Sequence, residues 1–178
     1  MNQADQDEQI EGIVRAYSYE AGHGKQFLGV ELEARSGVSW VLTYAQFTPF
    51  HAFAERRVTV VGRDFRPEGQ ILASMDWNRP LGHFRVSTMR LVAVTDDAEY
   101  VQVGPAHNLL GRLERGRSDS GEPTQSFTTE DGTTFVVADY PHAVPVGGLV
   151  EVEAYPLQRL PLQSSPSEPC LWITLARR

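Results

Sequence analysis

Five histidines are the most obvious residues that could do chemistry in this chain, and their spacing argues against a dedicated metal site. No two of them have His-x-x-x-His spacing, and a single cysteine, Cys170, cannot supply a Cys-x-x-Cys ligand pair. We therefore predict no metal site and no cofactor. The histidines are His23, His51, His83, His107 and His142.

Other residue types that serve catalysis are also poorly arranged. Ser118-Asp119-Ser120 lies in a polar turn, and no Gly-x-Ser-x-Gly elbow is present. Gly22-His23-Gly24-Lys25 lacks the spacing of a phosphate-binding loop. The acid pairs Glu31/Glu33 and Glu151/Glu153 are two residues apart on expected strands, where same-face carboxylates are usually a solvated surface. We expect a protein that is not an enzyme.

The elements that must position these residues are strands. Residues 27–34 and 38–44 alternate in polarity and are joined through Gly37, which predicts a β-hairpin. The pattern assigns Leu28, Val30 and Leu32 to the core side. It assigns Trp40 and Tyr44 to the core with Leu42, rather than to a base-stacking platform. The opposite, outer face would carry Glu31, Glu33, Ser39, Val41 and Thr43.

Two further strands are expected at 58–63 and 84–94, and one short helix around residues 50–56. Many short strands between Gly and Pro turns indicate an all-β barrel or sandwich.

The same order of strands and turns occurs twice along the chain. Gly12 matches Gly111, Trp40 matches Phe135 and His51 matches His142. We expect an acidic tail at 1–8, one barrel at 9–94, a linker or bridging strand at 95–106, and a second barrel at 107–178.

Each copy resembles the OB (oligonucleotide/oligosaccharide-binding) fold, a five-stranded Greek-key barrel whose first strand is bent at a glycine. The resemblance implies two small barrels in tandem, with ligands on the outer face of the second and third strands and on nearby loops. SH3-like barrels and a single β-sandwich are the alternatives.

Charge is divided unevenly between the copies. The net charge of −7 separates into −1 for residues 1–94 and −6 for residues 95–178. Nucleic-acid binding relies on clustered Lys and Arg, so only the first copy is a candidate for it.

The segment between the last two strands of the first copy, 64–82, is unusually long for a connection in a compact domain. Its apolar, Met and Arg side chains are of the types that anchor protein interfaces, or its apolar residues could plug the barrel end. The predicted partner-binding residues are Phe65, Arg66, Ile71, Leu72, Met75, Trp77 and Arg79. The equivalent segment of the second copy, 156–169, is rich in Pro and Ser and predicts an extended excursion.

Our leading interpretation is a non-catalytic adaptor or assembly subunit that binds a protein partner. The alternative is a single-stranded nucleic-acid-binding protein, which would use Arg56, Arg57, Arg63, Arg66, Phe65, Trp77 and Phe84. No apolar run is long enough to span a membrane, and the acidic N-terminus is unlike a signal peptide, so we expect a cytoplasmic protein. The sequence does not predict an oligomeric state.

Overall fold

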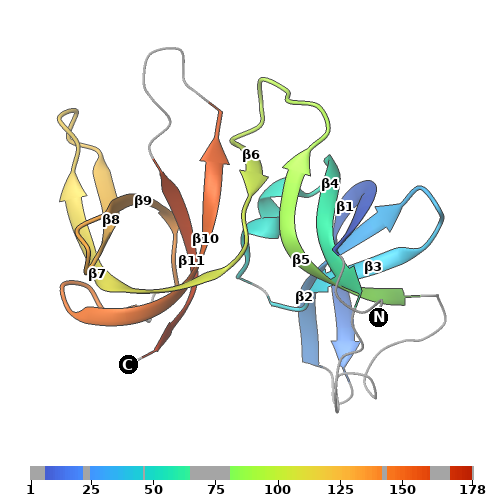
Figure 1. The fold of residues 1–178 in the computed structure, drawn as a ribbon, viewed down its shortest axis with the longest axis horizontal. Helices are drawn as coiled ribbons and strands as arrows, with labels where there is room; N and C mark the ends of the chain where they lie inside the picture. The colour runs from blue at the N-terminus through green and yellow to red at the C-terminus, as the bar shows by residue number, and fades with distance from the viewer. Residues whose placement is uncertain are drawn as a thin grey trace. The chain divides into compact units, whose positions relative to one another are not determined.

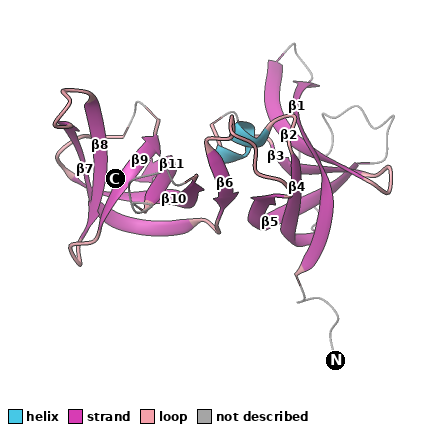
Figure 2. Cartoon of the chain, turned by 90° about the horizontal axis from the view of Figure 1, so that it is seen from above, coloured by secondary structure: helices cyan, strands magenta, loops and turns pink. Residues whose placement is uncertain are grey.

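The computed structural model describes residues 7–21, 25–45, 47–64, 81–141, 144–160 and 169–177, and these residues form an all-β protein (Figures 1 and 2). The chain divides into two compact units, Met1–Asp96 and Asp97–Arg178. The division falls within the segment 95–106. The all-β fold class expected from the sequence is confirmed.

Five strands of the first unit close into a barrel: β1 (Glu8–Ala21), β2 (Lys25–Ala34), β3 (Ser39–Thr43), β4 (Arg57–Asp64) and β5 (Leu81–Leu91). Antiparallel pairings join β2 to β3 and β4 to β5, and join β1 to both β2 and β4. A parallel pairing of β3 with β5 completes the ring. This closed barrel is compatible with an OB-like barrel.

A short 3-10 helix, η2 (Pro49–Phe53), connects β3 to β4 (cyan in Figure 2). It is shorter than the helix expected at 50–56. Glu55 has a φ of 62°, which lies outside the helical region, so the chain leaves the helix before β4 begins.

The second unit contains β6 (Tyr100–Val103), β7 (His107–Arg117), β8 (Pro123–Thr129), β9 (Thr134–Asp139), β10 (Leu149–Arg159) and β11 (Cys170–Arg177). Antiparallel pairings join β7 to β8, β8 to β9, β10 to β11 and β7 to β10, and β9 pairs with β11 in parallel. These pairings follow the same order as those of the first unit. β6 pairs with β10, so part of the segment 95–106 is a strand.

The long first strand of each unit bends at a glycine so that it can pair with two neighbours. Gly12 pairs with Ala34 on β2 and with Val58 on β4, and Gly111 pairs with Thr129 on β8 and with Val150 on β10. A Cβ atom at Gly12 would lie 2.4 Å from a backbone oxygen of β2, and one at Gly111 would lie 2.3 Å from a backbone oxygen of β8. Glycine is required at both bends because the backbones approach so closely.

Strand β10 extends further than the sequence indicated, because Pro156 lies inside it instead of opening a loop. Pro156 is opposite Leu171 on β11, and its carbonyl oxygen accepts a hydrogen bond of 2.8 Å from the Gly104 N–H. A proline fits at this position because its carbonyl supplies the pairing and no N–H donor is needed there. Residues 161–168 of the predicted excursion lie outside the described residues.

Each unit has an apolar core of its own. In the first unit, fully buried side chains come from all five barrel strands and from η2: Val14, Val30, Leu32, Val41, Phe53, Val58, Val60, Phe84 and Met89. In the second unit the core is formed by Leu113, Phe127, Val137, Tyr140, Val144, Val150, Val152, Ala154, Leu171 and Ile173. All residues of the second core belong to the second unit, which therefore has the apolar interior that a separate small domain needs.

Candidate binding surfaces

The seven residues predicted to bind a partner lie within 65–80 and are therefore outside the described residues. The structure does describe the two strands that flank this segment. The pairing of β4 with β5 continues to Asp64 and Phe84, so the chain leaves and re-enters the barrel at neighbouring points.

Four arginines lie on the outer face of the β4–β5 pair, and we call them the arginine face: Arg57, Arg63, Arg85 and Arg90. All four are exposed, whereas Val58, Val60, Met89 and Phe84, which alternate with them, are buried in the barrel. Strand alternation therefore separates an apolar inner side from a basic outer side.

Arg63 and Arg85 are directly opposite each other in the strand register. Side chains at opposite positions have Cβ atoms about 5 Å apart, and like charges at such positions repel each other. Arg57 lies at the other end of the face, where its Nε atom is 3.9 Å from a carboxylate oxygen of Glu11. Arg63 and Arg85 thus lie at the end of the face that is beside the segment 65–80.

Sequence reasoning placed Arg57 and Arg63 in the nucleic-acid site but omitted Arg85 and Arg90. The register of β4 with β5 shows that the four belong to one surface. Strict alternation within the predicted strand 84–94 puts residues five apart on opposite sides, so it could not have assigned both Arg85 and Arg90 to the outer side. The register shift between Val61 and Gly62, which skips Ser87 in β5, brings the two arginines to the same side.

Phe84 is removed from the candidates for base stacking. Its side chain is fully buried, and its ring packs edge-to-face against Trp40 at a centroid distance of 5.6 Å. A ring in the barrel core cannot stack on a nucleotide base. The same contact supports the core assignment of Trp40.

Arg56 is directed along the end of the barrel rather than onto the arginine face. Its guanidinium donates a hydrogen bond of 2.9 Å to the Thr95 hydroxyl, and its backbone carbonyl accepts a hydrogen bond of 3.0 Å from the Val14 N–H. The Arg56 side chain thus links the residue before β4 to the segment that follows β5.

The outer face of β2 and β3 differs from the solvated surface that the sequence indicated. Glu31 and Val41 are only 2% and 1% exposed, whereas Leu28, which was assigned to the core, is 49% exposed. The pattern treated residues 27–44 as an isolated hairpin. In the barrel this hairpin is flanked by β1 and β5, and Arg15, Glu31, Val41 and His83 stand side by side across four strands.

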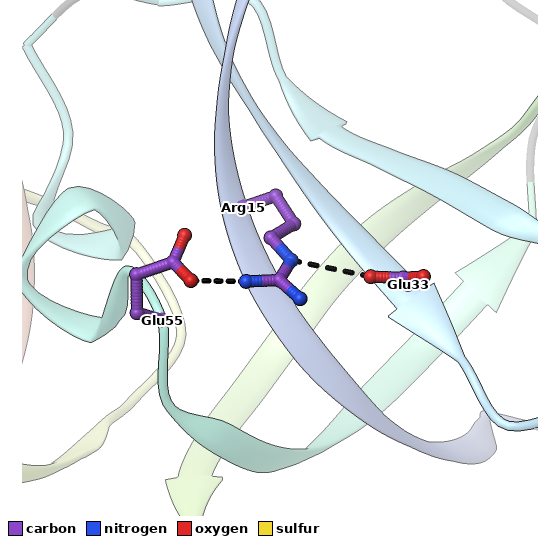
Figure 3. Close-up of polar contacts among 3 residues, drawn as sticks. All are labelled: Arg15, Glu33 and Glu55. Carbon is purple, nitrogen blue, oxygen red and sulfur yellow. Dashed lines mark hydrogen bonds and ion pairs between the residues drawn. The ribbon is translucent and has the colours of Figure 1, made fainter.

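Arg15 connects three parts of the first unit (Figure 3). From β1, its Nε atom donates a hydrogen bond of 3.2 Å to a carboxylate oxygen of Glu33 on β2, and an Nη atom is ion-paired with Glu55 after η2. Hydrogen bonding to Glu33 is the main cause of the raised pKa of Arg15. Because these side chains are largely exposed, we assign the network a role in orienting the η2–β4 turn rather than in stability.

Tyr44 and His83 form a hydrogen bond next to this row, between the Tyr44 hydroxyl and the Nε2 atom of His83. Burial, together with the negative charge of Glu31, raises the pKa of Tyr44 to about 12. Burial lowers the pKa of His83. The tyrosine is therefore a donor at neutral pH and the imidazole is a neutral acceptor. This hydrogen bond links the residue that follows β3 to strand β5.

Within the described residues, no group of three or more His, Cys, Asp or Glu side chains could hold a metal ion. Cys170 is buried, and burial raises the pKa of its thiol, which keeps the sulfur in its unreactive protonated form. In the described part of the chain, no helix reaches the length and hydrophobicity needed to cross a bilayer.

Comparison of the chain with protein-family models, with curated proteins and with solved structures found no match.

Proposed function

We propose that the chain consists of two OB-like barrels in tandem and acts as a non-catalytic adaptor or assembly subunit. The tandem arrangement is supported by the equivalent order of strand pairing in the two units and by the equivalent bends at Gly12 and Gly111.

The partner of the first barrel would be a protein with an acidic surface, bound at the arginine face. One observation carries this proposal: Arg63 and Arg85 are exposed and directly opposite each other, immediately beside the segment that contains the predicted partner-binding residues. Guanidinium groups can form two parallel hydrogen bonds to a carboxylate, and arginine is enriched at protein interfaces.

Single-stranded nucleic acid is the second candidate, and the same arginines support it. The outward residues of β4 and β5 argue for the protein partner instead, because no aromatic ring is among them to stack on bases. These residues are Arg57, Thr59, Val61, Arg63, Arg85, Thr88 and Arg90.

Charge reversal at Arg63 and Arg85 tests the proposal. We expect the variant R63E/R85E to fold normally and to lose its partner in co-purification from the source cells, quantified by mass spectrometry. The control R112E/R117E makes the same change in charge on the second unit and should retain the partner. A second variant, with residues 66–80 replaced by a short Gly-Ser turn, should also lose it.

Fluorescence anisotropy with a labelled single-stranded oligonucleotide separates the two candidates. We expect no binding at low salt. Binding that weakens steeply with salt and is lost in R63E/R85E would replace the protein-partner proposal by the nucleic-acid alternative. An unchanged set of co-purified partners in R63E/R85E would show that the arginine face is not the site.

A further inference from the structure

Strands β1 and β2 continue past the closed ring as a two-stranded hairpin, which we call the β1–β2 arm (residues 16–21 and 25–29). β1 pairs with β2 over Gly12–Ala21 but with β4 only over Glu8–Ile13, and the pairing of β2 with β3 begins at Val30. In the part of the chain that the structure describes, the arm is therefore paired only between its own two strands.

Alternation along β1 determines which backbone groups face away from β2. The Val14 N–H donates a hydrogen bond of 3.0 Å to the Arg56 carbonyl oxygen, and the Val14 carbonyl oxygen accepts one of 2.8 Å from the Glu55 N–H. Because the β1–β2 register is unbroken, Ala16 and Ser18 direct their N–H and C=O groups to the same side as Val14. Ala16 and Ser18 are both exposed. The arm thus presents a short, accessible strand edge.

The equivalent edge of the second unit carries charged side chains. Counting from the glycine that pairs with both neighbouring strands in each unit, Arg115 and Arg117 on β7 are the counterparts of Ala16 and Ser18. Long charged side chains on an edge strand hinder the addition of another strand, and so does proline. Residues 16–19 contain neither a charge nor a proline. The edge is therefore protected in the second unit and unprotected in the first.

We propose that the β1 edge of the arm pairs in antiparallel fashion with the same edge of a second copy of this chain. A two-fold axis at Ser18 places each Ser18 opposite its equivalent and Ala16 opposite Glu20, so the outward-directed backbone groups of both copies meet in register. The inference does not depend on the arginine face, which is on β4 and β5.

A second copy fits this edge because the edge is complementary to itself. Glu20 is the one charged residue in 16–21, so the proposed pairing brings no like charges opposite each other. Residues 1–94 carry a net charge of only −1, so little electrostatic repulsion opposes contact between two first units.

Such a contact is isologous, because both copies use the same edge. It joins the two arms into one four-stranded sheet and leaves neither copy with a free β1 edge. Association through this edge therefore stops at a dimer.

Sedimentation velocity of the full-length chain at increasing concentration tests this inference. We expect the wild-type protein to form a dimer and no larger species. The dimer should persist when salt is added, because backbone hydrogen bonds between uncharged residues are not screened as exposed ion pairs are. Hydrogen–deuterium exchange in residues 14–21 should slow as the dimer forms, because the Ser18 N–H becomes hydrogen-bonded.

The substitution S18P removes the N–H donor at the centre of the proposed contact. This N–H points away from β2, and proline is tolerated in an edge strand at such a position, so we expect the fold to be retained. The dimer loses two hydrogen bonds, one from each copy, and should form about tenfold to a hundredfold more weakly. The matched control S18A keeps the N–H and should dimerise like the wild type.

A second variant, A16R/S18R, gives the arm the arginines that the second unit has at Arg115 and Arg117. The charge introduced at position 18 would face its equivalent across the two-fold axis, so we expect a folded monomer. If S18P does not fold, A16R/S18R decides. A wild-type chain that remains monomeric at all concentrations, or folded variants that dimerise as readily as the wild type, would overturn the inference. A dimer that dissociates as salt is added would also overturn it, because its contact would depend on charged surfaces.

Discussion

At the scale of single residues, burial rather than residue type decides what the polar side chains of the first barrel do. Glu31 and His83 lie within the same row across the sheet and are almost inaccessible to solvent, whereas Arg15 and Glu33 are exposed. Alternation in a single strand predicts which side of the strand a residue takes. It does not predict whether that side is exposed to solvent, because exposure depends on parts of the chain that are distant in sequence.

The buried imidazole of His83 makes stability depend on pH. Its pKa is lowered in the folded state relative to the ordinary value of 6.5. As the pH falls through 6.5, the unfolded chain therefore binds a proton at this position that the folded chain does not bind, and the free energy of unfolding decreases. The contribution is fully present above pH 6.5 and is lost as the pH falls toward the lowered pKa.

Urea unfolding across the range from neutral to mildly acidic pH checks this prediction. We expect the free energy of unfolding of H83Q to decrease less at acidic pH than that of the wild type. The difference should correspond to the uptake of at most one proton on unfolding. The exposed His107 provides the matched control, and H107Q should leave the pH dependence unchanged. Equal pH dependence in H83Q and the wild type would contradict the assignment.

At the scale of elements, the glycines in β1 and β7 allow each of these strands to approach a neighbouring strand closely. The substitution G111A would place a Cβ atom 2.3 Å from the Thr128 carbonyl oxygen, and G12A would place one 2.4 Å from the Glu33 carbonyl oxygen. Crowding of this kind against backbone costs about 1–3 kcal/mol. We expect both variants to unfold at lower urea concentration than the wild type.

Gly148 provides the control for this prediction, because a Cβ atom there would meet nothing within 4 Å. G148A should have wild-type stability. If G111A were as stable as G148A, the close approach of β7 and β8 would not be a requirement of the fold.

The elements also show what the sequence could and could not predict. The all-β class and the hairpin around Gly37 follow from local patterns, namely period-2 alternation and glycine in turns. Two other features do not follow from local patterns, namely the extension of β10 through Pro156 and the register shift in β5. Each of them depends on the strand that pairs at that position. The arginine face is intermediate: its residues are visible in the sequence, but their grouping requires the register of β4 with β5.

At the scale of the whole molecule, each unit contains its own ring of pairings and its own core. We therefore expect a fragment of residues 97–178 to fold alone, with a strand-type circular dichroism spectrum and cooperative unfolding in urea. The substitution F127A, which removes a fully buried ring, should destabilise this fragment by about 3–5 kcal/mol. A fragment without ordered structure would show that the second unit depends on the first.

The closed ring of the first unit also restricts how a partner can be recognised. Each of β1 to β5 has a paired strand on both sides over part of its length, so the backbone donors and acceptors of those stretches are already used within the barrel. Outside them, residues 16–21 of β1 pair only with β2, and residues 25–29 of β2 pair only with β1. An incoming chain cannot be captured in the doubly paired stretches by adding a strand to a sheet edge, which is the route that is least dependent on side chains. Recognition through the ring must use outward side chains. Specificity could therefore change in evolution by substitutions at a few outer positions, while the inward positions keep the barrel intact.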